Sequence, residues 1–288
     1  MRLINVDSRL AIERDGRALD VEHASGGRFS CDVQAVYERW ADFRAWAAQV
    51  DGEGQPVDEA RLGSPVPSPR QVFAIGLNYR DHAAEGNVEL PDIPMVFTKF
   101  PSSIAGPHAE IVLPADTVDW EAELVVVIGC HAESVQPADA WDHVAGLTVG
   151  QDVSERTLQR KPQLCLAKSF PGFSPLGPAL VTPDEFDDPS DLEIGCLVDG
   201  VQMQKARTSD LIFSIPDLVA YLSSILPLWP GDVIFTGTPS GVGAVRNPPR
   251  FLRPGNELTT YIEGIGTMRH RFRAAPRHAH GESEGINA

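Results

Sequence analysis

Three carboxylates stand within five residues in VDWEAELVVVIG, residues 118–129. Side chains alternate along a strand, so Asp119, Glu121 and Glu123 would share one face, with the two glutamates roughly 7 Å apart. Like charges this close, beside the apolar run VVVI, raise one another's pKa unless a cation compensates them. Carboxylate oxygens without nearby His or Cys favour Mg²⁺, Mn²⁺ or Ca²⁺. The alternative is a solvated strand end whose acids pair with surface Arg or Lys.

A further acid, Asp152, follows the strand-like run GLTVGQ and opens the segment DVSERTLQRKPQLCLAKSF. In this segment Arg156 and Gln159 lie one helical step apart, and Lys168 follows. Taken alone, Arg156 is typical of a surface salt bridge. Beside an acidic metal site, however, Arg156, Gln159 and Lys168 would form a wall that binds carboxylate and keto groups.

The segment FAIGLNYRDHAAEG, residues 73–86, predicts a strand, a tight turn and a short helical turn. His82 and Glu85 are then neighbours at positions i and i+3. A histidine paired with a carboxylate has a defined tautomer and enough basicity to take a proton from water. An isolated H-x-x-E also occurs as a surface pair without a function, so this pattern leaves both interpretations open.

The glycine-rich stretch PGDVIFTGTPSGVG, residues 230–243, resembles a phosphate-binding loop at first sight. It lacks the G-x-x-x-x-G-K-[ST] spacing and leads into no helical pattern, which excludes a nucleotide loop. We expect a turn whose glycines supply positive φ. In the functional interpretation, the hydroxyl or backbone N–H of Thr238 would also face a substrate.

Composition limits the class of protein. The 288 residues carry a formal net charge of −16, which disfavours nucleic-acid and anionic-membrane partners. Four cysteines without C-x-x-C spacing argue against structural zinc and disulfides, and we expect them to be small buried side chains. The N-terminus has no signal-peptide pattern and no apolar run could span a membrane. These features predict a cytoplasmic protein.

Short strands separated by Gly and Pro dominate the chain after residue 72, which predicts an α+β, mainly β fold. The first sixty residues contain short strands and a helical pattern over residues 33–50. The proline-rich segment 62–72 separates the two parts. We predict a small N-terminal α/β domain with linker (1–66), a catalytic domain (67–274) and a disordered tail (275–288). A helix is expected over IPDLVAYLSSIL, residues 215–226.

Six motifs in fixed order give a specific resemblance: GLNYRDHAAE, FTKFPSSIAGP, VDWEAELVVVIG, QDVSER, AKSFPGFSPLGP and PGDVIFTGTPSGVG. From about residue 72 to 273 the chain resembles the fumarylacetoacetate hydrolase family, in particular its short bacterial acylpyruvate hydrolases, oxaloacetate decarboxylases and diene-dioate isomerases. The resemblance implies a mixed β-roll, a small N-terminal domain and a homodimer. Many relatives have an aromatic residue shortly before the lysine, where this chain has Gln163 to Leu166.

The resemblance also implies roles for residues. Glu121, Glu123 and Asp152 would bind Mg²⁺ or Mn²⁺, with Ca²⁺ as a possible substitute. His82 and Glu85 would activate water on a lid, Lys168 would stabilise an enolate, and the substrate contacts would come from Arg156, Gln159 and Thr238.

The function expected from this combination is metal-dependent hydrolysis of a C–C bond in a small 2,4-dioxo acid of the acylpyruvate type. Decarboxylation of oxaloacetate-like acids, or isomerisation of 2-hydroxy-dienedioates in aromatic catabolism, is the alternative, because all three reactions place an enolate beside a metal. A non-catalytic metal- or sugar-binding β module would not need His82 or Lys168 in the same pocket. The lack of G-x-G-x-x-G after a strand disfavours an oxidoreductase.

Overall fold

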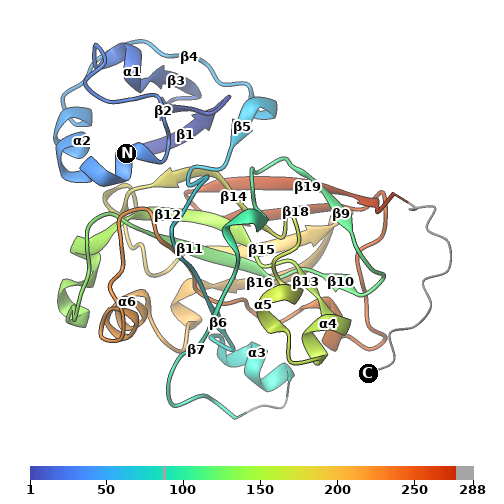
Figure 1. Cartoon of the computed structure of the whole chain (residues 1–288). Coiled ribbons are helices and arrows are strands. Elements are labelled where there is room, and N and C mark those ends of the chain that lie inside the picture. The colour runs from blue at the N-terminus through green and yellow to red at the C-terminus, as the bar shows by residue number, and fades with distance from the viewer. Residues whose placement is uncertain (87–88, 277–288) are drawn as a thin grey trace, which may run out of the picture.

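The computed structural model describes residues 1–86 and 89–276. Most of the predicted tail (277–288), and residues 87–88 of the predicted lid, lie outside the described residues. The N-terminal part forms the upper lobe in Figure 1 and the mixed β-roll lies below it. The predicted α+β, mainly β class is therefore confirmed.

The largest sheet has twelve strands and runs through both lobes. Its order is β4-β3-β2-β1-β14-β12-β11-β17-β6-β7, with β5 beside β1 and β8 beside β14. Their bounds are β1 Arg2–Val6, β2 Arg9–Arg14, β3 Arg17–Asp20, β4 Gln55–Pro56, β5 Leu62–Gly63, β6 Val72–Gly76, β7 Met95–Thr98, β8 Ile104–Ala105, β11 Ala122–Ile128, β12 Val144–Gln151, β14 Ser174–Val181 and β17 Val233–Phe235.

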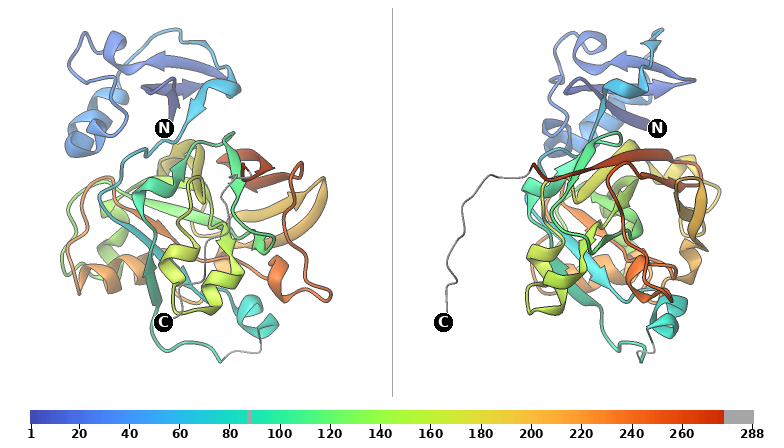
Figure 2. Two further views of the ribbon diagram at one scale, coloured as in Figure 1. Left: turned by 45° about the vertical axis from the view of Figure 1, so that its right-hand side comes forward. Right: turned by 90° about the vertical axis from the view of Figure 1, so that its right-hand side faces the viewer.

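A second sheet of five strands, in the order β16-β15-β18-β19-β9, closes the roll. Figure 2 shows the two sheets curving around a common interior. The bounds of these strands are β9 Glu110–Leu113, β15 Glu193–Val198, β16 Val201–Arg207, β18 Glu257–Ile262 and β19 Gly266–Ala274, and the short pair β10 Val118–Asp119 and β13 Ser154–Glu155 stands apart from both sheets.

The helices are short; α1 and α2 belong to the N-terminal lobe, and α3 to α6 lie around the roll. They are α1 Val21–Ala24, α2 Trp40–Ala47, α3 Arg80–Glu85, α4 Arg156–Arg160, α5 Leu164–Ala167 and α6 Ile215–Ser223. The helix predicted near residue 215 is confirmed, and Ser214 forms a capping box with Asp217 at its start. The helix predicted over residues 33–50 is shorter, because a 3₁₀ turn precedes α2 and the non-helical backbone of Arg39 (φ −125°) separates them.

Strand β11 lies in the middle of the larger sheet, between β12 and β17. Its side chains alternate between two apolar clusters, with Leu124, Val126 and Ile128 in one and Val125 and Val127 in the other. Both faces of this strand are therefore buried, which explains why its sequence is continuously aliphatic rather than alternating. The carboxylates that precede the run enter a dry interior.

Two expectations need correction. Segment 62–72 is not wholly irregular, because Leu62–Gly63 forms β5 and pairs with β1. The cysteines are all free, but Cys196 is buried while Cys130 is exposed, and Cys31 and Cys165 are half-buried. Cys130 lies at the exposed end of the loop after β11, where packing does not require burial.

Among the described residues, no helix is long and apolar enough to cross a membrane.

His270 on β19 gives the fold a measurable pH dependence. Burial lowers its pKa to about 4, although its Nε2 lies 3.2 Å from the carbonyl oxygen of Gly106. In the unfolded chain this histidine takes up a proton near pH 6.5, whereas in the folded chain it stays neutral until about pH 4. The free energy of unfolding therefore falls by about 2 kcal/mol as the pH drops from about 7 to 5.

We expect His270→Gln to flatten the dependence of the unfolding free energy on pH over this range. Denaturant unfolding at several pH values measures the slope. The exposed His23 provides the control, and His23→Gln should leave the slope unchanged. Equal slopes for wild type and His270→Gln would contradict the assignment.

Candidate active site

The acidic stretch is divided by a strand break. β10 ends at Asp119 and β11 begins at Ala122, with the fully buried Trp120 and Glu121 between them. The carbonyl oxygen of Glu121 accepts a hydrogen bond from the amide of Asp152, 2.9 Å away. The break therefore brings the end of β12 against the start of β11, and Asp152 beside the glutamates.

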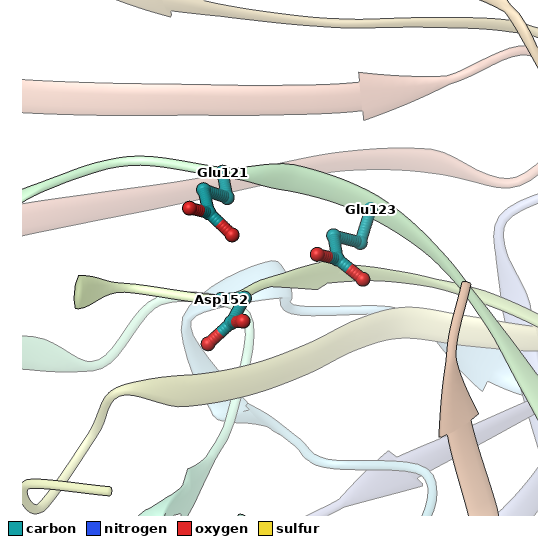
Figure 3. A group of neighbouring side chains, drawn as sticks. All are labelled: Glu121, Glu123 and Asp152. Atoms are coloured by element: carbon teal, nitrogen blue, oxygen red, sulfur yellow. The ribbon is translucent and has the colours of Figure 1, made fainter. Parts of the chain in front are cut away.

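Glu121, Glu123 and Asp152 converge on one point (Figure 3). Each offers a carboxylate oxygen, and the three oxygens lie within 4.8 Å of one another. All three side chains are buried, at 7%, 1% and 0% exposure. A solvated strand end is thereby excluded for this segment.

Asp119 is not part of this triad. One of its oxygens accepts from Nε of Arg156 at 2.5 Å and the other from the amide of Ala244 at 2.8 Å. Burial raises the pKa of Asp119 to about 6, against the lowering effect of Arg156. The expectation that three successive acids share one face fails because the strand is interrupted after Asp119.

Two cations contact the triad, and one of them, Lys168, bridges two of its members. Nη2 of Arg156 donates a hydrogen bond to Glu121 at 2.7 Å. The ammonium of Lys168 donates to Glu121 at 2.8 Å and to Asp152 at 2.5 Å. Burial lowers the pKa of Lys168, but the charges of Asp152 and Glu121 outweigh it and the net shift is upward. Lys168 is therefore a charged ammonium at the wall of the site.

The two glutamates are held in different states. Burial raises the pKa of Glu121, but Lys168 and Arg156 outweigh it and bring the value to about 2. The pKa of Glu123 is raised well above its usual value by burial and by the charges of Asp152 and Glu121. The positive charges beside Glu121 therefore do not bring the pKa of Glu123 down to its usual value. Oε2 of Glu123 accepts a hydrogen bond from the amide of Gly237 at 2.8 Å.

Lys99 is a site residue that the sequence reasoning missed. It is 1% exposed, and its ammonium donates to Asp152, to the carbonyl oxygen of Lys168 and, at 3.2 Å, to that of Phe173. Burial lowers its pKa, against the effect of Asp152. It fixes both Asp152 and the backbone of Lys168. The signal was the lysine of FTKFPSS, the one charge in an apolar and small-residue stretch.

Helix α3 carries His82 and Glu85 at the mouth of the site. Nδ1 of His82 lies 3.4 Å from Oε2 of Glu85, a long hydrogen-bond contact. The Glu85 carboxylate also accepts from the amide of Gly241, at 3.0 Å from Oε2. Glu85 therefore orients His82 and ties α3 to the glycine-rich loop.

The predicted substrate-binding residues lie together. Within α4, Oε1 of Gln159 accepts a hydrogen bond from Nη1 of Arg156 at 2.8 Å. The hydroxyl of Thr238 is already engaged, because it donates to the carbonyl oxygen of Ala122 at 2.9 Å and accepts from Gln204 at 2.8 Å. A substrate contact from Thr238 would therefore come from its backbone.

A cavity of about 120 Å³ lies at the centre of these groups. Its polar wall contains seven of the nine predicted site residues: His82, Glu121, Glu123, Arg156, Gln159, Lys168 and Thr238. Its apolar wall includes Met95 and Phe97 of β7 and Leu164 of α5. Leu164 belongs to the segment where many relatives carry an aromatic residue, so the sequence departure lies in the wall of the cavity.

The side chains present fit a divalent cation. Three buried carboxylates and no His or Cys make a hard oxygen donor set. Lys168 and Arg156 donate to Glu121, whereas burial and the charges of Asp152 and Glu121 raise the pKa of Glu123. A cation held by Glu121, Glu123 and Asp152 would offset the repulsion among the three carboxylates.

Comparison with known proteins agrees with this geometry. Residues 71–273 match the family described as fumarylacetoacetate (FAA) hydrolase C-terminal. The human mitochondrial oxaloacetate tautomerase FAHD2A is 46% identical over 230 residues, which cover 78% of this chain and 73% of the relative. A Mycobacterium smegmatis structure provisionally named HpcE has a TM-score of 0.91 and 52% identity, covering 96% of this chain and 100% of that one.

A maleylpyruvate hydrolase from Sphingobium sp. SYK-6, solved with manganese(II) and pyruvate, has a TM-score of 0.79 and 28% identity, covering 96% of this chain and 100% of that one. The chain belongs to the fumarylacetoacetate hydrolase family. The predicted family and its mixed β-roll fold are thereby confirmed. The relatives include both a tautomerase and a hydrolase, so membership alone leaves the reaction open.

The separation of Asp119 from the triad can be tested with isosteric amides. Glu121→Gln removes a ligand charge and should weaken Mn²⁺ binding by more than about tenfold, because one unit charge near 4 Å contributes several kcal/mol even at an effective dielectric of 20. Asp119→Asn removes an acid outside the triad and should change the affinity far less. Isothermal calorimetry measures both.

Equal losses in the two variants would show that Asp119 belongs to the metal site. Unchanged affinity in Glu121→Gln would remove Glu121 from it.

Proposed function

We propose that this protein is a Mg²⁺- or Mn²⁺-dependent enzyme that interconverts the enol and keto forms of a small 2-oxo diacid of the oxaloacetate type. The observation that carries the proposal is that His82, Lys168 and the two glutamates of the triad line one cavity of about 120 Å³, with Asp152 directly behind Lys168. The size suits a short 2-oxo acid. The similarity to oxaloacetate tautomerases supports this choice of reaction.

A cation bound by Glu121, Glu123 and Asp152 would neutralise the substrate's carboxylate and polarise its 2-keto oxygen. Arg156 and Lys168 add positive charge on the side of Glu121, at 2.7 and 2.8 Å from its oxygens. With a divalent cation bound, these charges together would make the cavity attractive to an anion although the chain has a net charge of −16.

The proposed reaction moves one proton and no other atom. As the enol converts to the ketone, the O–H proton passes to water, its bonding electrons form the C=O bond, and the C=C electrons take a proton at C3 from His82, which regains one from water. His82, held through Nδ1 by Glu85, presents Nε2 as the acid and base for C3. Lys168 holds the negative charge that develops on the enol oxygen.

Hydrolysis of an acylpyruvate is the second candidate, and the apolar wall favours it. Met95, Phe97 and Leu164 offer an apolar surface for the acyl group of such a substrate. In this reaction His82 would take a proton from water, whose oxygen attacks the 4-keto carbon. The C3–C4 bond then breaks, leaving pyruvate enolate and a carboxylic acid.

The cytoplasmic location expected from the sequence also remains a proposal, since the human relative carries "mitochondrial" in its name.

The reaction is tested by following the absorbance of oxaloacetate enol in the presence of Mn²⁺, and pyruvate release from acetylpyruvate and fumarylpyruvate. We expect enzyme-dependent loss of the enol that EDTA abolishes. His82→Asn should lower kcat by about 10² to 10⁴, the usual contribution of a general acid or base. His131→Asn, at an exposed histidine outside the cavity, is the matched control.

Pyruvate release with an acid co-product, and no acceleration of enol loss, would replace tautomerisation by hydrolysis. Full activity of His82→Asn in both assays would contradict the role given to His82.

We also propose that the protein assembles as a homodimer through β7. This strand ends the order of the larger sheet, and its Met95 and Val96 are 43% and 38% exposed. Between Asp92 and the buried Lys99 the sequence carries no charge, in a chain with a net charge of −16. Edge strands are usually protected by charged side chains, so an uncharged apolar edge indicates a partner strand.

Val96→Lys should convert the dimer to a monomer at micromolar concentration, measured by light scattering after size exclusion. Val201→Lys places the same charge on β16, the edge of the second sheet, and should leave the dimer intact. Loss of the dimer in the Val201 variant alone would move the interface to β16, and a monomeric wild type would refute the assembly.

A further inference from the structure

The strand break that forms the site leaves backbone groups without ladder partners. Between β10 and β11 the amides of Glu121 and Ala122 are buried, and a buried amide without an acceptor is strongly destabilising. Two glutamine side chains supply the acceptors. Oε1 of Gln151 lies 2.9 Å from the amide of Glu121, and Oε1 of Gln204 lies 2.8 Å from that of Ala122.

Gln204 comes from the other sheet. It lies on β16, is 1% exposed, and reaches across the roll to the start of β11. Its Nε2 donates to the hydroxyl of Thr238 at 2.8 Å and to the carbonyl oxygen of Pro239 at 2.7 Å. The hydroxyl of Thr238 in turn donates to the carbonyl oxygen of Ala122 at 2.9 Å. These bonds form a closed ring around the peptide groups of Ala122.

The position of this ring connects it to the metal ligands. Ala122 is the residue between Glu121 and Glu123, so a rotation of its backbone moves both carboxylates relative to each other. The loop that Gln204 holds also supplies the amide of Gly237, which donates to Oε2 of Glu123 at 2.8 Å. Gln204 therefore controls the backbone between the two ligands and the loop that orients one of them.

We propose that Gln204 is a positioning residue for the metal carboxylates, a role that rests on the metal site of the proposed function. An amide suits this position because one side chain must accept from an N–H and donate to two oxygens. It does so without adding a charge beside carboxylates that already repel one another. Groups that orient metal ligands commonly change metal affinity or activity by 10- to 100-fold when removed.

The test compares Mn²⁺ binding to the metal-free full chain in wild type and Gln204→Met, by calorimetry and by electron paramagnetic resonance. Methionine keeps the length and shape of the side chain but loses its acceptor and donors. We expect an affinity at least about tenfold weaker and a changed spectrum of bound Mn²⁺. Gln204→Asn, which keeps the amide but is one methylene shorter, should show the same direction if the methionine variant does not fold.

Thr208→Val is the matched control for lost stability. Thr208 follows β16 directly, is 2% exposed, and its hydroxyl donates to the carbonyl oxygen of Ser190 and accepts from the amide of Leu192, each at 2.9 Å. Valine removes these buried hydrogen bonds far from the triad. We expect a lower melting temperature, as in Gln204→Met, but Mn²⁺ affinity and spectrum equal to wild type.

Wild-type Mn²⁺ affinity and spectrum in Gln204→Met, or equal losses in Gln204→Met and Thr208→Val, would overturn the positioning role while leaving the metal site intact. Absence of Mn²⁺ binding in the wild type itself would overturn the metal site and this inference together. Activity is not required for any of these readouts, so a wrong choice of substrate does not affect them.

Discussion

Three carboxylates buried within 4.8 Å of one another are the constraint around which this protein is organised. In a dry interior their mutual repulsion is large, and each must be neutralised by a proton or by a neighbouring cation. Lys168 and Arg156 perform this task for Glu121, and Lys99 and Lys168 for Asp152. Among the described residues Glu123 forms no such ion pair, and burial together with the charges of Asp152 and Glu121 raises its pKa well above the usual value.

The interrupted strand makes this arrangement possible. A regular β11 extending back through Asp119 would pair its amides with a neighbouring strand and would present alternate residues along a row. Instead the strand is interrupted after Asp119, and glutamine side chains from β12 and β16 accept hydrogen bonds from the amides of Glu121 and Ala122. The backbone N–H of Asp152 donates a hydrogen bond to the carbonyl oxygen of Glu121, which holds Asp152 beside the glutamates. The carboxylates therefore converge on a point.

The cavity joins two environments that suit different ends of a substrate. One wall concentrates carboxylates and cations, and the other is lined by Met95, Phe97 and Leu164. A 2-oxo acid would place its carboxylate and keto group on the charged side, where an enolate is stabilised. The substituent that the substrate places at the apolar side then determines the reaction. Loss of a proton, of a carboxylate or of an acyl group from that end gives different products through the same enolate.

Much of this could be predicted from sequence, because the residues that do chemistry are close together in short motifs. The E-x-E pair with Asp152 and the i, i+3 spacing of His82 and Glu85 are local patterns, and the aliphatic run of β11 is an unambiguous buried strand. Lys99 could not be assigned a role, because its partner Asp152 lies 53 residues away and the contact forms only in the folded chain.

Strands β14, β16 and β19 have weak strand signals in the sequence, for different reasons. Prolines and glycine within SPLGPALV conceal β14, and polar residues dominate β16 and the exposed face of β19, whose buried and exposed residues alternate. The separation of Asp119 from the triad depends on Arg156, which lies 37 residues away. Sequence spacing alone could not distinguish these acids.

The central claim is that Glu121, Glu123 and Asp152 bind a divalent ion on which a 2-oxo acid is held. Anomalous diffraction from crystals soaked with Mn²⁺ and oxalate, an unreactive analogue of an enolate, tests this directly. The account predicts one manganese peak within coordination distance of all three carboxylates, with oxalate between the ion and the Lys168 side of the cavity. A manganese peak elsewhere, with the three carboxylates still bound by the lysines and Arg156 alone, would contradict it.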